Sequence, residues 1–318
     1  MSVETVSLPT RRIDSRAGHL RRRVANRVML SLMGLATLLA LVPLVWIIGY
    51  VVLRGGKSLN LDFFTQLPKP LGIAGGGVLP AIEGTLLLVL IAAVFAIPVG
   101  ILAALYVARY PNTPLGVAVR FGTDVLAGIP SIVIGLFGYA LIVKTQGHYS
   151  AFAGGVSLAI LMLPTVIRTT EEMVKLVPGT LREASLALGA PEWKTSLSVI
   201  LPAAADGVIT GFLLGLARAA GETAPLLFTA LGNERFELGK LISSGIENGQ
   251  DVFSIIERIF SQPVDSLPLT LWKYAQQPFP ERVDQSWGVA LVLMILIFSL
   301  NIGARWWAAS RKSSRKTG

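Results

Sequence analysis

Long apolar runs alternate along this chain with polar, charged or glycine-rich segments. An α-helix rises 1.5 Å per residue, so about 20 apolar residues cross the hydrocarbon core of a bilayer. Six runs reach or approach this length, and the fourth is the shortest. They predict an all-α polytopic membrane protein, with six transmembrane helices over approximately residues 29–53, 85–108, 123–143, 151–167, 207–231 and 287–307.

Composition supports this prediction. Hydrophobic residues make up 53% of the 318 residues and charged residues 15%, against about 25% charged residues in a typical soluble domain. So much apolar surface excludes both a water-soluble protein of this size and a disordered chain. The sequence has no cysteine and only two histidines, His19 and His148, so we expect no disulfide, no thiol catalysis and no metal site.

The basic residues predict the orientation of the spans. A basic arm at residues 1–28 and a basic tail at residues 309–318 lie on the same side if there are six spans. That side then carries 18 basic residues, counting the loops after the second and fourth spans, and the other side carries nine. Lys and Arg accumulate on cytoplasmic loops. We therefore expect a multi-pass membrane protein, in contact with lipid, with both termini cytoplasmic and outer loops at residues 54–84 and 233–286.

The same distribution accounts for the net charge of +9. In a soluble protein such a charge would suggest a nucleic-acid partner. Here no basic patch is interleaved with aromatic residues, as single-strand binding requires. We expect no nucleic-acid partner.

The cytoplasmic loop at residues 168–206 has helical periodicity and contains a predicted helix–turn–helix from Arg182 to Pro202. Gly189 can adopt a positive φ and end the first helix, and Pro191 suits the first turn of the second. An exposed, partly apolar hairpin on a membrane protein suits the docking of a soluble partner. The alternative is an amphipathic loop that rests on the lipid headgroups.

This segment resembles the EAA loop of ABC-transporter permeases. Glu183, Ala184, Gly189, Leu201 and Pro202 stand at the spacing of that motif, and the substitutions at residues 185 and 199 keep the size of the side chain. The resemblance implies that the loop docks in a groove of an ATP-binding subunit. The residues expected to couple the two subunits are Arg182, Glu183, Ala184, Ser185, Gly189, Ala190, Leu201 and Pro202.

The fifth predicted span carries an unusual polar face. At 100° per residue, Gly207, Gly211, Gly215, Arg218 and Glu222 fall within a sector of roughly 80°. The glycines let another helix approach closely, and Arg218 can pair with Glu222 at i and i+4. A charge in mid-span costs at least about 2.5–3.5 kcal/mol on insertion scales, so it faces protein or water. The ion pair either fixes helix packing or orients Arg218 to bind an anion such as phosphate, which suits its planar fork of N–H donors.

Two further charged residues have alternative interpretations. Arg168, at the predicted end of the fourth span, either anchors the helix at the interface or lines the inner exit for an anion. Asp124, at the start of the third span, either interacts with the helix dipole or takes part in transport.

Four segments resemble the PstA family of permeases from phosphate-specific ABC transporters. They run over residues 84–110, 124–140, 163–178 and 218–228, the last with the sequence RAAGETAPLLF. The resemblance covers about residues 75–232 and the terminal span. It implies a MetI-like permease core of five spans, at residues 85–308, preceded by an added first span. It also implies a substrate path that includes Arg218, Glu222, Arg168 and Thr223.

The resemblance further implies an assembly of several subunits in the bacterial plasma (inner) membrane. The expected partners are a PstC-like permease, a dimer of PstB-like ATPases that bind ATP–Mg, and a PstS-like extracytoplasmic phosphate-binding protein. This chain would be no enzyme and would bind no cofactor itself. Composition and spacing leave open whether the anion is phosphate, sulfate or molybdate. They also leave open a membrane scaffold or sensor of a phosphate-signalling complex.

Overall fold

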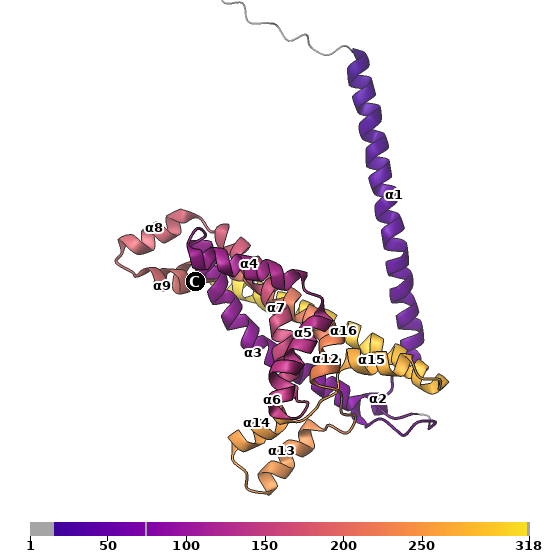
Figure 1. Ribbon diagram of the computed structural model, residues 1–318. Helices are drawn as coiled ribbons and strands as arrows, with labels where there is room; N and C mark the ends of the chain where they lie inside the picture. The colour runs from indigo at the N-terminus through magenta and orange to yellow at the C-terminus, as the bar shows by residue number, and fades with distance from the viewer. Residues whose placement is uncertain (1–15, 74, 317–318) are drawn as a thin grey trace, which may run out of the picture. The chain divides into compact units, whose positions relative to one another are not determined.

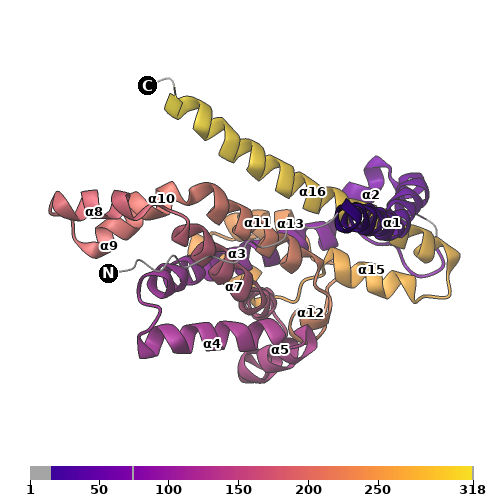
Figure 2. The ribbon, with the colours of Figure 1, turned by 90° about the horizontal axis from the view of Figure 1, so that it is seen from above.

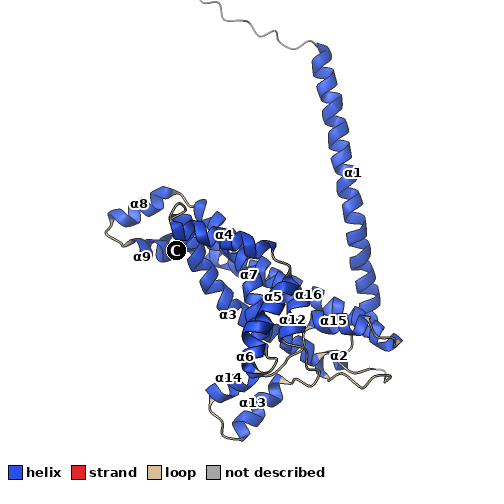
Figure 3. Ribbon diagram, in the orientation of Figure 1, coloured by secondary structure: helices blue, strands red, loops and turns tan. Residues whose placement is uncertain are grey.

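The computed structural model describes residues 16–73 and 75–316, with side chains for residues 21–73 and 75–303. The described part is built from helices and contains no named strand (Figure 3). Residues 1–15 of the predicted arm and residues 317–318 of the predicted tail lie outside the described residues. The chain divides into two compact units, residues 1–52 and 53–318.

Most of the first unit is one long helix. Helix α1 runs from Arg16 to Gly55, with Pro43 inside it. It contains the whole predicted first span and extends past both of its ends. The segment Arg21–Ser58, which continues three residues past the end of α1, is long and apolar enough to cross a membrane.

The second unit is organised around three helices, of which one pair runs parallel and one pair runs antiparallel. Helix α3 (Leu79–Arg109) packs against α7 (Ala151–Lys175), and α7 also packs against α11 (Ala205–Gly221). Small residues allow this close approach, because a Cβ on Gly100 would meet the Val166 side chain of α7 at 2.7 Å. The fourth predicted span is part of α7, which continues to Lys175 and is eight residues longer than predicted.

The third predicted span is bent. Helix α4 (Pro114–Gly128) meets α5 (Ser131–Gly138) at an angle of 106°, and the chain continues through η2 (Tyr139–Val143) and α6 (Lys144–Gln146). Pro130 has no N–H group and disfavours the helical region at Ile129, whose ψ is 131°. The prediction of one continuous helix over residues 123–143 is therefore wrong.

The fifth predicted span is interrupted near its polar end. Helix α11 ends at Gly221, Glu222 is extended with ψ 128°, and α12 (Ala224–Thr229) follows. Pro225 cannot donate the hydrogen bond that a continuous helix would need at the Gly221 carbonyl. The prediction of a single helix over residues 207–231 is wrong for this reason. At its other end α11 begins after a bend of 78° from the segment Glu192–Ala203.

The described residues contain four single helices able to span a membrane, and six spans if each bent pair counts as one. The last of the four is the segment Pro280–Gly303 of α16, a helix that runs from Pro280 to Lys316. The prediction of an all-α polytopic membrane protein is confirmed.

Short helices lie at both ends of the second unit. At one end α8 (Gly179–Ala187) and α9 (Glu192–Thr195) form a hairpin that leads through η3 (Ser196–Ile200) and α10 (Leu201–Ala203) into α11 (Figures 1 and 2). At the other end lie α13 (Leu238–Glu247) and α14 (Val252–Ser261) (Figure 1). The remaining elements are η1 (Gly56–Ser58), α2 (Leu61–Thr65) and α15 (Leu267–Ala275), and α15 packs on α16.

Candidate functional site

The predicted ion pair lies at the end of α11. Arg218 is in the last turn, and its Nε is 3.5 Å from Oε1 of Glu222. Glu222 has already left the helix, but its N–H still donates to the Ala219 carbonyl, which keeps its side chain within reach. The Arg218 side chain is 46% exposed and that of Glu222 is 20% exposed. Arg218 therefore keeps a large accessible surface while its carboxylate partner is mostly covered.

The two interrupted helices lie side by side. A Cβ on Gly135 of α5 would meet the Pro225 Cα of α12 at 2.6 Å, and a Cβ on Gly138 would meet Thr229 Cγ2 at 3.0 Å. Helices α5 and α12 therefore run parallel, with residues 135 and 138 opposite residues 225 and 229. The break at Pro130 lies five residues before Gly135, and the break at Glu222 lies three residues before Pro225. Both breaks therefore precede the contact between α5 and α12.

Paired breaks of this kind have a functional meaning in membrane proteins. Irregular backbone at membrane depth is tolerated only where it is buried in protein or lines a water-filled cavity. Transporters place substrate sites at such discontinuous helices. Pro130, Arg218 and Gly221 are exposed on this chain, and Thr223 is partly buried at the start of α12. This face of the molecule is therefore free to line a polar path.

The predicted packing glycines face α7 rather than the path. A Cβ on Gly207 would overlap Met173, one on Gly211 would overlap Thr169, and one on Gly215 would meet Met162 Cγ at 2.8 Å. The glycine face therefore seats α11 on α7, and this contact ends one turn before Arg218.

Arg168 lies seven residues before the end of α7, not at the end of a span as predicted. Its guanidinium group forms an ion pair with Asp124 of α4. One turn along each helix, Arg120 of α4 donates to Glu171 of α7 over 2.5 Å. We call these four residues the α4–α7 charge ladder. The side chains of Arg168 and Asp124 are each about half exposed, whereas the Glu171 side chain is 9% exposed.

The hairpin formed by α8 and α9, which we call the coupling hairpin after its predicted role, has the predicted turn. Gly189 has φ +81°, and its N–H donates to the Leu186 carbonyl over 2.9 Å. Ser185 and Thr195 join the two helices through a 2.9 Å hydroxyl contact. The Leu188 side chain at the tip is 90% exposed, and Trp193 is 67% exposed. An apolar tip of this kind is available to a protein partner.

The other predicted coupling residues occupy two parts of the hairpin. Glu183 and Ala184 are exposed, whereas Arg182 and Ala190 are partly buried. Leu201 and Pro202 lie on α10 at the base, and both are partly buried.

Glu192 ties the hairpin to the core, a role that the sequence analysis missed. Its carboxylate accepts from Arg182 of α8 over 2.5 and 2.7 Å and from Arg109, at the end of α3, over 3.3 Å. Hydrogen bonds from Arg182, and then from Arg109, lower the pKa of Glu192 to about 2. The carboxylate is ionised at neutral pH and links three elements. In the sequence, Glu192 is only an acidic residue at the start of a helix, directly after Pro191. Its partner Arg109 is distant in the sequence, so no local pattern indicates their pairing.

Within the described chain no group of three or more His, Asp or Glu residues could hold a metal ion. The site therefore consists of a projecting hairpin, a polar helix break and a charge ladder. Together with the spans, these are features of a membrane transport permease. Residues 96–310 match the family described as the inner membrane component of binding-protein-dependent transport systems. The chain belongs to this family.

Curated relatives match the chain over nearly its whole length. The phosphate transport system permease protein PstA of Yersinia pestis is 40% identical over 292 residues, which cover 92% of each chain. The protein of the same name from Mycobacterium leprae is 38% identical over 309 residues, covering 95% of this chain and 94% of the relative.

Solved structures share the fold. A chain of the inward-facing MetNI methionine ABC transporter is 18% identical, with a TM-score of 0.55, and the match covers 73% of this chain and 95% of that chain. A chain of a bacterial alginate ABC transporter is 14% identical, with a TM-score of 0.56, covering 89% and 94%. The predicted ABC-permease fold is confirmed.

Proposed function

We propose that this chain is a transmembrane permease subunit of an ATP-driven inorganic phosphate importer. The observation that carries the proposal is the position of Arg218 at the break between α11 and α12, next to the contact of α12 with α5. The names of the relatives support phosphate as the substrate. An arginine fork binds a tetrahedral oxyanion through parallel N–H donors. Glu222 orients this fork and competes with the anion, which limits how tightly the anion is held.

The coupling hairpin transmits the state of an ATPase to this site. The segment Glu192–Ala203 leads directly into α11, whose far end carries Arg218. Glu192 also ties the hairpin to α3 through Arg109. A movement of the hairpin therefore reaches the substrate path along two helices. Nucleotide hydrolysis, with ATP–Mg, belongs to a PstB-like dimer docked on the hairpin.

The charge ladder forms the next part of the path. An anion that leaves Arg218 meets Arg168, whose guanidinium is held by Asp124. The anion must compete with this carboxylate, as it does with Glu222 at the first site. Thr223 offers a hydroxyl at the helix break, beyond Arg218 on the side away from Arg168. A PstC-like permease completes the path on the exposed face, and both termini are cytoplasmic. A PstS-like protein delivers phosphate to the outer face.

The test is phosphate uptake by the complex reconstituted in proteoliposomes with its ATPase, partner permease and receptor. We expect ATP-dependent uptake of radiolabelled phosphate that excess unlabelled phosphate suppresses and excess sulfate or molybdate does not. Suppression by sulfate or molybdate at equal concentration would assign the chain to another oxyanion. Uptake that does not depend on ATP, or the absence of any uptake, would contradict the proposal.

A further inference from the structure

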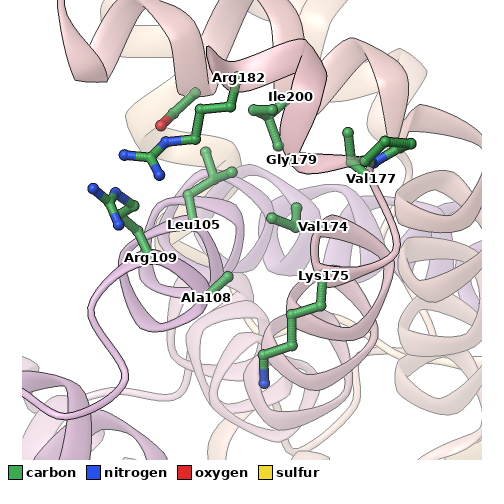
Figure 4. Close-up of a pocket in the computed structure, with 11 residues that line it drawn as sticks. Leu105, Ala108, Arg109, Val174, Lys175, Val177, Gly179, Arg182 and Ile200 are labelled. Atoms are coloured by element: carbon green, nitrogen blue, oxygen red, sulfur yellow. The ribbon is translucent and has the colours of Figure 1, made fainter. Parts of the chain in front are cut away.

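A second basic site lies at the base of the coupling hairpin, away from the helix breaks. A cleft of about 280 Å³ opens between the ends of α3 and α7 and the elements α8 and η3 (Figure 4). Its apolar wall includes Leu105, Val174 and Ile200, and its charged lining consists of Arg109, Lys175 and Arg182. Figure 4 shows the two guanidinium groups close together at one side of the cleft.

The cations of this cleft outnumber the carboxylates that neutralise them. Glu192 is shared between Arg109 and Arg182, and Glu171 is shared between Lys175 and Arg120. The three cations of the lining therefore share two carboxylates, and one of these, Glu171, is also paired with Arg120 outside the lining. Neither carboxylate belongs to the lining of the cleft, whose charged side chains are all basic. A ligand that enters the cleft therefore meets a positive field.

Arg182 also has an unused hydrogen-bond donor. Its Nε is buried and has no hydrogen-bond partner among the described residues, although its Nη2 donates to Glu192. A buried donor without an acceptor costs free energy of about 1–3 kcal/mol, and more when the group is charged. An anionic oxygen in the cleft would accept from this N–H group and remove that cost.

We propose that the cleft binds a phosphate group, a chemistry that an anionic phospholipid headgroup and free inorganic phosphate share. Arginine pairs suit phosphate oxygens, and basic pockets between transmembrane helices on the cytoplasmic side bind acidic headgroups. The apolar wall of Leu105, Val174 and Ile200 adjoins the basic side chains, as the glycerol and acyl part of a lipid requires. Free phosphate would fill only the basic side.

The position of the cleft gives its occupancy a consequence. A bound phosphate group would join α8 of the coupling hairpin to the ends of the spanning helices α3 and α7. It would stiffen the link that Glu192 already makes. This consequence rests on the proposed function and its membrane orientation, whereas the binding itself does not.

Binding is tested on the whole complex in two arms. In the lipid arm, the complex is purified from nanodiscs of phosphatidylcholine with or without phosphatidylglycerol, and retained lipid is counted by native mass spectrometry. In the phosphate arm, binding of radiolabelled inorganic phosphate is measured by equilibrium dialysis. The second arm uses complexes that carry Arg218→Gln with Glu222→Gln, so that the translocation site does not contribute.

Three variants identify the site. Arg182→Gln removes the unpaired donor, and Ala108→Leu narrows the cleft without changing any charge, since Ala108 lines it. Lys194→Gln is the matched control, because it removes a positive charge from an exposed position of the same hairpin outside the cleft. We expect about tenfold weaker binding in Arg182→Gln, as the loss of one charge-assisted contact predicts. Binding should also weaken in Ala108→Leu, because the larger side chain fills part of the cleft, and should equal that of the wild type in the control.

The two arms separate the sources of the phosphate group. Loss in the lipid arm alone assigns a headgroup, loss in the phosphate arm alone assigns free phosphate, and loss in both supports one site open to either. Equal binding by the wild type, Arg182→Gln and Ala108→Leu in both arms would overturn the proposal. If Arg182→Gln fails to assemble, Ala108→Leu decides. Phosphate uptake is measured separately, so failed uptake with intact cleft binding contradicts only the proposed function.

Discussion

Replacing Gly135 by alanine should disturb the contact between the two interrupted helices. The added Cβ would lie 2.6 Å from Pro225 Cα, whereas ordinary contacts begin at 3.4 Å. Helices α5 and α12 must therefore separate by about 0.8 Å, because both contacting groups are backbone or fixed to it. Overpacking of this kind costs about 1–3 kcal/mol. Alanine gains about 1 kcal/mol over glycine in a helix, so we expect a net destabilisation of about 0–2 kcal/mol.

The same displacement should also affect transport. It moves the segment that carries Thr223 and Glu222 relative to the start of α5. If one charge-assisted hydrogen bond to the anion is lost, worth about 1.5 kcal/mol, uptake falls about tenfold. Phosphate uptake and ATPase activity are measured on the same reconstituted preparation, and ATPase activity should remain.

Gly122→Ala in α4 is the matched control for this substitution. A Cβ on Gly122 meets nothing within 4 Å, so this change should leave uptake unchanged and stabilise α4 slightly. Equal uptake by Gly135→Ala and Gly122→Ala, at equal amounts of complex, would refute the role of the contact between α5 and α12.

Three other predictions follow from the charges. Arg120→Gln leaves a buried carboxylate with one cation fewer and should destabilise the complex by about 1–3 kcal/mol, whereas Asp124→Asn, at the half-exposed end of the ladder, should cost about 0–1 kcal/mol. Thermal unfolding checks both values. A larger loss of stability in Asp124→Asn than in Arg120→Gln would contradict the burial of the Glu171 carboxylate. A cysteine placed at Ser244 should react with an impermeant thiol reagent on intact cells and one at Ser313 should not, because both termini are proposed to be cytoplasmic; the reverse pattern would overturn the topology. The pKa of Glu192 is depressed to about 2 from an ordinary value of 4.5. The ionised carboxylate therefore contributes fully to the stability of the hairpin above pH 4.5, and this contribution is lost as the pH falls towards 2. Pepsin should cleave the hairpin of Glu192→Gln faster than that of the wild type at pH 4.5 and at the same rate near pH 2. Equal rates at both pH values would show that Glu192 does not hold the hairpin in place.

The parts of the fold that local pattern determines were predictable from the sequence. Length and hydropathy locate six spans, because the bilayer fixes the number of apolar residues that a helix needs. Gly189 ends α8 with a positive φ, as its lack of a Cβ permits. Arg218 and Glu222 meet because residues four apart are close even where the helix has just ended.

The interruptions and the long-range pairs were not predictable in the same way. Pro130 and Pro225 signal only that a helix can kink, and neighbouring helices decide whether it breaks. The contact of α5 with α12 depends on Gly135, whose role appears only when Pro225 is placed opposite it. Likewise Asp124 and Arg168 carry no local signal of their pairing, since they belong to different helices.

The central claim is that Arg218 binds the transported anion, and a paired neutralisation tests it most directly. Arg218→Gln alone leaves Glu222 unpaired, so folding and transport could fail together. Arg218→Gln with Glu222→Gln removes both charges at similar volume. The measurement is ATP-dependent phosphate uptake per assembled complex, with the amount of complex in the membrane determined in the same preparation. We predict that the double variant assembles at the wild-type level and imports little phosphate. Near-normal uptake by the assembled double variant would show that the anion does not depend on Arg218 and would contradict the account.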